Sequence, residues 1–309
     1  ILARRGSNLD ALRLIAALCV VVSHAWPLAL GPGPAEPLEN LTGHSLGGWA
    51  VLLFFFISGL LISQSAERRS TGEFWAARAR RIMPGLLTGL LFALTLAIVT
   101  GATPSLYEDI RYILRGLSLF GLEHKISGAY ASNPYPLAVN GPLWSLQHEV
   151  AAYFICFLAV RLGLLRKPIG LAIFAVASLA LALLAPTLPT KLATFAPLFF
   201  AYALGMISWR LREIIALRIE LLMVFLAIAI LLKGTVMWEN VAALTFAYGV
   251  LFVAYRTPVI RVRHDLSFGV YIYGWPIAQT IIFLMPGLTP MALAVASIVC
   301  TIPFAFASW

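Results

Sequence analysis

The chain of 309 residues is long enough for two soluble domains or for one membrane domain with many spans. Apolar residues make up 61% of it and charged residues 11%, against about 45–50% and about 25% in soluble domains. This composition excludes a soluble globular enzyme, a disordered chain and a collagen-like fibre. A transmembrane β-barrel is also disfavoured, because its strands alternate apolar and polar residues, whereas the apolar residues here form long unbroken runs. We therefore predict an all-α, polytopic membrane protein.

Ten apolar segments are long enough to cross a bilayer, which takes about 20 residues of helix. We expect the spans at roughly residues 10–30, 45–64, 82–100, 142–161, 169–186, 191–209, 217–233, 239–255, 266–285 and 290–309. Spans seven and eight are the weakest predictions. Arg218 and Glu220 shorten the first of these two spans, and Glu239 and Asn240 shorten the second.

Basic residues divide unevenly between the two sides of the predicted bundle. If the N-terminus lies inside and the spans alternate, 17 of the 22 Lys and Arg residues fall inside, Arg4 and Arg5 among them, and 5 fall outside. Cytoplasmic loops of helical membrane proteins collect Lys and Arg in this way. We therefore expect both termini in the cytoplasm, and we attribute the net charge of +9 to membrane orientation, not to nucleic-acid binding.

The loop at about 101–141 is too long for a simple hairpin and is rich in Tyr and Pro. Long loops in compact domains are usually functional lids or disordered segments. We expect a partly ordered lid on the outer side of a single transmembrane domain that covers residues 1–309.

The three cysteines, Cys19, Cys156 and Cys300, all lie inside apolar runs. Cysteine in such places usually packs as a small apolar side chain. We expect neither a disulfide nor a metal site, and no bound cofactor.

Span one carries Asp10, Arg13 and His24, and ionisable groups inside a bilayer are costly enough to mark a candidate site. Arg13 and His24 are 11 residues apart. This spacing is about 20° from full register, so the two share a helix face and lie about 16 Å apart along the axis. Asp10 can pair with Arg13 three residues later. Taken singly, Arg13 could be an interfacial cation, and His24 could make a structural hydrogen bond between helices.

Two further clusters contain ionisable side chains. Arg78 and Arg81, between spans two and three, face one way if their segment is helical. They fit either ordinary anchoring at the inner face or a clamp for phosphate, which suits the bidentate guanidinium. At the start of span four, Ser145, His148 and Glu149 share one helix face after Trp144. The alternative for Glu149 is an interfacial residue at the outer end of the helix.

The Ser58-Gly59 pair in span two and the segment from Tyr271 to Pro276 in span nine, with Gln279, form the last group. Small residues allow helices to approach closely, and Pro276 should kink its helix and free a carbonyl. Packing is the default interpretation of both.

In this order, the clusters resemble the acyltransferase-3 family of integral-membrane O-acyltransferases, and the match runs over most of the chain. The matching segments are Asp10-Ala11-Leu12-Arg13 with ten residues between Arg13 and His24, Phe55-Phe56-Ile57-Ser58-Gly59, Arg78-Ala79-Arg80-Arg81-Ile82-Met83-Pro84, Leu143-Trp144-Ser145-Leu146 followed by Glu149, and Tyr271-Ile272-Tyr273 before Pro276. No single motif is specific. The Arg-ten-His spacing, the Trp-Ser-Leu segment and the ten spans are specific together.

The resemblance implies an enzyme that takes an acyl group, usually acetyl, from cytoplasmic acyl-CoA and transfers it to a hydroxyl of an exported or cell-surface glycan or lipid-linked sugar. It implies a multi-pass protein of the bacterial inner membrane, in contact with membrane lipid. The family's essential Arg and His map onto Arg13 and His24, its arginine motif maps onto Arg78 and Arg81, and its acidic position maps onto Glu149. The supporting positions are Asp10, Ser58, Trp144, Ser145 and Tyr271.

The chain departs from the family pattern in three places. Ala77 stands where the arginine motif often opens with Arg, and Gly274 stands near the place of a His that many members have in span nine. Members also usually continue beyond the position of Trp309 with a short tail.

Acyl transfer to an alcohol needs a base for the hydroxyl proton and stabilisation of a tetrahedral intermediate. His24 is the best candidate base, because imidazole titrates near neutral pH, and Glu149 could orient it or carry the proton away. Arg13, Arg78 and Arg81 would hold the CoA phosphates. The axial distance of about 16 Å between Arg13 and His24 suits the extended arm of acyl-CoA that carries the thioester. Direct transfer and an acyl-enzyme, on Ser145 or Ser23, are both open.

Two other classes compete with the enzyme. Intramembrane Arg, His and Glu also form proton-coupled transport pathways, but a carrier often has repeated halves and interrupted helices, and the sequence shows neither. A structural membrane protein explains none of the polar clusters. Release of free CoA thiol in the presence of an acceptor would separate the enzyme from both.

Overall fold

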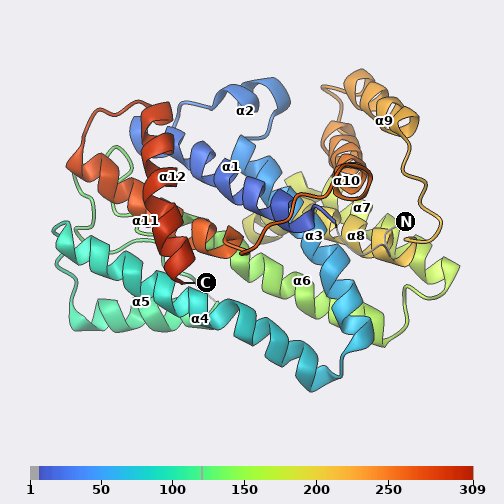
Figure 1. The fold of residues 1–309 in the computed structure, drawn as a ribbon, viewed down its shortest axis with the longest axis horizontal. Coiled ribbons are helices and arrows are strands. Elements are labelled where there is room, and N and C mark those ends of the chain that lie inside the picture. The colour runs from blue at the N-terminus through green and yellow to red at the C-terminus, as the bar shows by residue number, and fades with distance from the viewer. Residues whose placement is uncertain (1–6, 120, 309) are drawn as a thin grey trace. The chain divides into compact units, whose positions relative to one another are not determined.

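The computed structural model describes residues 7–119 and 121–308, and their regular structure is helical (Figure 1). Extended pairing within these residues is limited to an isolated bridge between Lys125 and Ala138. The all-α prediction is therefore confirmed. Arg4 and Arg5, which we expect on the inner side, and Trp309 lie outside the described residues.

The helices follow one another closely along the chain. They are α1 (Leu9–Leu30), α2 (Pro37–Thr42), α3 (Leu46–Arg68), α4 (Thr71–Val99), α5 (Leu106–Ser118), η1 (Gly141–Leu143), α6 (Trp144–Arg161), α7 (Pro168–Leu183), η2 (Ala185–Thr187), α8 (Thr190–Arg210), α9 (Ile219–Leu231), α10 (Trp238–Arg256), α11 (Ser267–Leu284) and α12 (Pro290–Ala307).

Seven helical segments are long and apolar enough to cross a membrane: α1, α3, α4, η1 with α6, α8, α11 and α12. Three of the ten predicted spans are not among them. Helices α7 and α9 have 16 and 13 residues, which is about 24 Å and about 20 Å of rise against a hydrocarbon core of about 30 Å. Helix α10 has 19 residues but carries Glu239, Asn240 and Arg256. A multi-span helical membrane protein is supported, whereas the count of ten and the side of each terminus stay predictions.

The predicted third span starts earlier than its apolar run suggests. Helix α4 begins at Thr71, so the arginine segment is part of a 29-residue helix. A capping box explains the early start, because the Ser70 N–H donates to Glu73 and the Glu73 N–H donates to the Ser70 hydroxyl. Arg78 and Arg81 therefore do lie on one helix.

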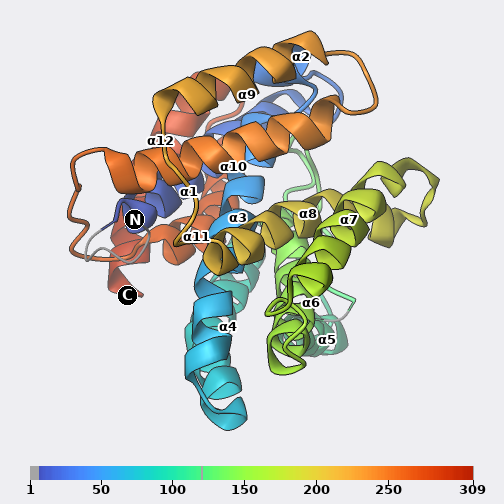
Figure 2. The ribbon, with the colours of Figure 1, turned by 90° about the vertical axis from the view of Figure 1, so that its right-hand side faces the viewer.

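The chain forms two compact units. The α8 unit contains residues 1–12, 51–74 and 148–261, and the α11 unit contains residues 13–50, 75–147 and 262–309. In the α8 unit, α7 packs against α8 and α9 packs against α10 (Figure 2). In the α11 unit, α11 packs along α12.

Helices α3 and α8 of the α8 unit cross at two glycines. A Cβ at Gly59 would lie 2.0 Å from the carbonyl oxygen of Tyr202, and a Cβ at Gly205 would lie 2.1 Å from that of Phe56. Backbone atoms cannot move aside as a flexible side chain can, so both positions require glycine. The packing interpretation of the Ser58-Gly59 pair is confirmed for Gly59.

We expect Gly205→Ala to destabilise the protein, because the new methyl group overlaps the backbone of α3. Overpacking of this kind costs about 1–3 kcal/mol and occasionally more. Thermal unfolding in detergent, followed by fluorescence, should give a clearly lower Tm. Gly72→Ala is the matched control, because a Cβ at Gly72 meets no atom within 4 Å. Equal Tm values for the two variants would contradict the tight crossing.

The predicted outer loop is largely ordered and packs within the α11 unit. Its first part is α5, which begins with a capping box between Ser105 and Glu108. A Cβ at Gly116 of α5 would lie 2.5 Å from the Leu90 side chain, so α5 lies close against α4. The described residues of segment 121–140, which follows α5, are anchored to α11 by buried hydrogen bonds.

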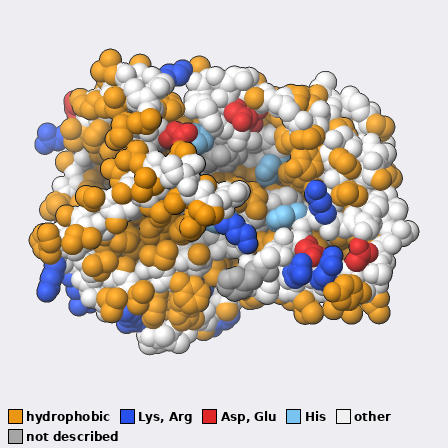
Figure 3. All heavy atoms as spheres, turned by 180° about the vertical axis from the view of Figure 1, so that it is seen from behind, with side chains coloured by type: hydrophobic (Ala, Val, Ile, Leu, Met, Phe, Trp, Pro, Cys, Tyr) orange, Lys and Arg blue, Asp and Glu red, His pale blue; other side chains and the backbone are white. Residues whose placement is uncertain are grey.

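Large apolar side chains cover much of the surface. Exposed Leu, Ile, Val, Met and Phe residues occur on most of the long helices, and hydrophobic side chains dominate the face drawn in Figure 3. Soluble monomers rarely expose contiguous apolar surface on this scale. The surface therefore fits a protein embedded in lipid.

Candidate functional site

Helix α1 places Arg13 and His24 on one continuous helix of the α11 unit. The helix runs unbroken from Leu9 to Leu30 and includes Pro27. Eleven residues of α-helix correspond to about 16 Å along the axis. The local prediction from helical spacing therefore holds in the structure.

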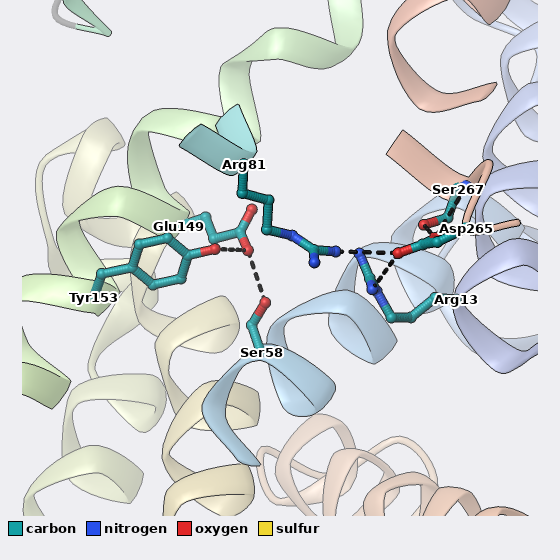
Figure 4. Close-up of polar contacts among 7 residues, drawn as sticks. All are labelled: Arg13, Ser58, Arg81, Glu149, Tyr153, Asp265 and Ser267. Carbon is teal, nitrogen blue, oxygen red and sulfur yellow. Dashed lines mark hydrogen bonds and ion pairs between the residues drawn. The ribbon is translucent and has the colours of Figure 1, made fainter. Parts of the chain in front are cut away.

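Arg13 and Arg81 converge on the carboxylate of Asp265, which lies just before α11 (Figure 4). Arg13 Nη1 is 2.8 Å and Arg81 Nη2 is 3.3 Å from Asp265 Oδ2. The other oxygen, Oδ1, accepts from the Ser267 hydroxyl at 2.5 Å and from its N–H at 3.3 Å. These three charged side chains form the Arg13–Arg81–Asp265 cluster, which brings together two of the three predicted phosphate-binding arginines.

The charges of this cluster do not cancel. Burial disfavours the charged form of Asp265, but Arg13, the Ser267 hydroxyl and Arg81 outweigh it and hold the pKa of Asp265 below its ordinary value. Asp265 is therefore ionised at neutral pH. Two guanidinium groups against one carboxylate leave a net positive charge, which suits an anionic ligand. Arg78 lies one turn before Arg81 on α4 and is partly buried.

Asp10 was expected to pair with Arg13. Arg13 pairs with Asp265, 252 residues away in the sequence, and Asp10 is exposed one turn before Arg13. The Asp10–Arg13 pair itself stays a prediction.

His24 is partly buried and lies against α11. Its ring meets the Trp275 ring edge-on, with the centroids 5.0 Å apart and the planes at 79°. Its Nδ1 atom is buried and has no hydrogen-bond partner among residues 7–119 and 121–308. A structural hydrogen bond between helices, the alternative role for His24, is thus not made through Nδ1 by these residues. A buried polar atom without a partner is costly, so this atom fits a group that bonds a substrate or accepts a proton.

Glu149 lies in the α8 unit with two hydroxyl groups. Its Oε1 accepts from Ser58 Oγ at 2.7 Å and from the Tyr153 hydroxyl (Figure 4). The structure thus joins Glu149 with Ser58, which was predicted only as a supporting residue. The predicted pairing of Glu149 with His24 would join residues of the two units, and it stays a prediction.

Ser145 and Tyr271, two predicted supporting residues, meet in the α11 unit. The Ser145 hydroxyl is 2.7 Å from the Tyr271 hydroxyl, and Tyr271 donates to the carbonyl of Pro142. The hydroxyl of Ser145, a candidate for acylation, therefore lies against a tyrosine hydroxyl. Trp144 begins α6 beside it.

Ser23, the other candidate for acylation, is buried and its hydroxyl donates to the carboxylate of Glu36. Glu36 also accepts from the N–H of Leu46, the first residue of α3. Burial raises the pKa of Glu36 and Glu39 adds to this effect, while the Ser23 hydrogen bond opposes it. The carboxyl group thus favours its neutral form more in the folded protein than in the unfolded chain.

We expect Glu36→Gln to raise the Tm at neutral pH. The pKa of Glu36 is higher in the folded protein than in the unfolded chain, so above the folded pKa the ionised carboxylate lowers the free energy of unfolding. This destabilisation disappears below the pKa of the unfolded chain, which is about 4.3. The gain should therefore shrink as the pH falls to about 4. Glu39→Gln, an exposed neighbour, is the control and should shift the Tm much less. A lower Tm for Glu36→Gln at neutral pH would mean that the charge itself holds the start of α3.

Three residues of these clusters, Tyr153, Asp265 and Glu36, were missed in the sequence, and Trp275 was named only within the segment from Tyr271 to Pro276. Tyr153 lies one helical turn after Glu149, so the i,i+4 spacing could have revealed it. Asp265 is the one acidic residue in the basic stretch 256–265. Glu36 and the contact of Trp275 with His24 have no local sequence signal. Among the described residues, no three His, Cys, Asp or Glu side chains lie together as a metal site would require.

Comparison with known proteins agrees with the resemblance in the sequence. The model of a family described as an acyltransferase domain (acyltransferase-3) matches residues 7–309. The chain is 29% identical to an "O-acetyl transferase" of Shigella phage Sf6 over 299 residues, 90% of this chain and 86% of that protein. It is 29% identical to "Nodulation protein 10" of Rhizobium leguminosarum bv. viciae over 317 residues, covering 89% and 84%. No solved structure matches significantly.

Proposed function

This chain belongs to the acyltransferase-3 family, and we propose that it moves an acetyl group from cytoplasmic acyl-CoA to a hydroxyl of an exported or cell-surface glycan. A relative named as an O-acetyl transferase supports oxygen as the acceptor atom. Seven long apolar helices support a multi-pass membrane enzyme. We place it in the bacterial inner membrane as a single domain, with membrane lipid around it.

One observation carries this proposal. The α11 unit contains a positively charged cluster around Arg13 and, on the same helix, a histidine whose buried Nδ1 has no partner among the described residues. A donor with phosphates at one end and a thioester at the other fits such a pair of groups. The rise of about 16 Å between Arg13 and His24 leaves room for an extended arm.

In this mechanism Arg13, Arg78 and Arg81 bind the phosphates of the donor, since guanidinium groups match phosphate oxygens in pairs. His24 takes the proton of the acceptor hydroxyl, and the oxygen attacks the thioester carbonyl. The carbon–sulfur bond then breaks, the new ester leaves with the acceptor, and the CoA thiolate takes up the proton that His24 had accepted. No net proton is consumed. Glu149, with Ser58 and Tyr153, would carry or hold a proton.

The test uses purified protein in nanodiscs with radiolabelled acetyl-CoA and a crude envelope glycan. We expect label in the glycan and one free CoA thiol for each acetyl group transferred, both dependent on the acceptor. Acetyl-CoA binding without transfer to any envelope fraction would contradict the glycan acceptor. Absence of binding and transfer in folded protein, with dissipation of a pH gradient in proteoliposomes, would support a proton-coupled transporter instead.

A further inference from the structure

The inference concerns what holds the imidazole of His24 in place, and it rests on the proposed role of His24 as the base. A base must keep its ring within a narrow range of positions. The usual device is a hydrogen bond from the ring to a carboxylate. At Nδ1 of His24, no such bond is made by residues 7–119 and 121–308.

Trp275 contacts the His24 ring instead. Helices α1 and α11 come close at this level, because a Cβ at Gly274 would lie 2.6 Å from Cγ2 of Val21. The next residue, Trp275, is 6% exposed and directs the edge of one ring at the other, with 5.0 Å between the centroids. This arrangement is a favourable one for two aromatic rings.

Trp275 is itself held by residues of the segment that precedes α6. Its Nε1 donates to the carbonyl of Ala138 at 2.9 Å. The ring of Tyr135 packs against it at 5.5 Å and 88°, and a Cβ at Gly141 would lie 3.0 Å from three atoms of the indole. These three contacts restrict the orientation of the indole.

The partners of Trp275 are fixed to α11 in turn. Gln279, fully buried one turn later, donates from Nε2 to the carbonyls of Tyr135 and Ala138. Its Oε1 accepts from the buried amide of Asn133 at 2.8 Å. Satisfied buried networks of this kind are rigid. Segment 121–140 thus forms a stiff support behind the indole.

We propose that Trp275 is a positioning residue that fixes the imidazole of His24, and that segment 121–140 fixes Trp275. In place of a hydrogen bond from the ring to a carboxylate, the imidazole is held by contact with the Trp275 ring, which the hydrogen-bonded loop supports. The role of the ordered outer loop is then to hold the catalytic geometry from the acceptor side.

The test compares Trp275→Leu and Trp275→Phe in the acetyl-transfer assay. A misplacement of about 1 Å can cost about 100-fold in rate. We therefore expect Trp275→Leu to lower kcat by about 10- to 100-fold, with the KM for acetyl-CoA unchanged. Trp275→Phe keeps an aromatic edge and should recover most of that loss. The matched control is Trp49→Leu, because Trp49 makes a similar edge-on contact with His44 (5.4 Å, 73°) outside the site and should keep the wild-type kcat.

A double variant separates positioning from general stability. If Trp275 acts through His24, adding Trp275→Leu to His24→Gln should not lower the residual rate further. The inference would be overturned if Trp275→Leu lowered the transfer rate by the same factor in the wild type and in His24→Gln. It would also be overturned if Trp275→Leu weakened acetyl-CoA binding as much as it lowered the rate. If Trp275→Leu does not fold, Trp275→Phe and Tyr135→Leu give the same comparison.

The inference and the proposed function fail differently. If the His24→Gln variant kept the wild-type turnover rate, His24 would not be the base and the proposed mechanism would be wrong. Loss of turnover in His24→Gln with an unchanged kcat in folded Trp275→Leu would overturn the positioning role alone.

Discussion

His24→Gln should lower kcat for acetyl transfer by about 10²- to 10⁴-fold, which is the usual contribution of a positioned general base. Glutamine keeps a polar side chain of similar reach but cannot take the proton of the acceptor hydroxyl. Acetyl-CoA should bind with an affinity close to that of the wild type, because Arg13, the proposed phosphate-binding residue of α1, lies about 16 Å from His24 along the helix axis. Isothermal titration with acetyl-CoA and a single-turnover transfer assay measure the two quantities separately.

His44→Gln is the matched control for this variant. His44 also packs edge-on against a tryptophan, but we assign it no role in the site. It should keep turnover and binding. An equal loss of binding and turnover in His24→Gln would contradict the assignment of His24 as the base and would favour a role in donor binding or folding.

Local patterns predicted the parts of this protein that depend on one helix. The spacing of Arg13 and His24 follows from helical geometry alone, and both residues do lie on the one continuous helix α1. The close helix crossing at Gly59 was also predictable from a local pattern, because a small residue in a span favours close approach of a second helix. Composition was sufficient for the fold class, since long apolar runs have few stable alternatives.

Pairings between distant helices were beyond these patterns. Asp265 is 252 residues from Arg13, and no periodicity in the sequence indicates which helix ends will meet. The hydrogen bond from Trp275 to Ala138 likewise depends on the path of an irregular segment. The count of ten spans stays a prediction. Hydropathy finds apolar runs but does not fix where a helix ends, and α7 and α9 have 16 and 13 residues, whereas a span takes about 20.

Arg13→Gln should weaken acetyl-CoA binding by about 10- to 100-fold, because a charge-assisted hydrogen bond contributes about 1.5–3 kcal/mol. The variant also removes one of the two cations around Asp265 and leaves that carboxylate with Arg81. Binding should therefore depend less steeply on salt than in the wild type. Titration of acetyl-CoA at several salt concentrations measures both effects. Arg111→Gln is the matched control, since Arg111 pairs with Glu123 in the predicted outer region and should not affect the donor.

Two roles of Arg13 can be separated with Asp265. If Arg13 binds a phosphate directly, Asp265→Asn should not restore affinity to the Arg13→Gln variant, because the missing charge is still missing. If Arg13 serves only to neutralise Asp265, removing both charges should recover most of the loss. The contacts favour the first outcome. Asp265 already receives Arg81 and the hydroxyl of Ser267, so its charge is partly compensated without Arg13.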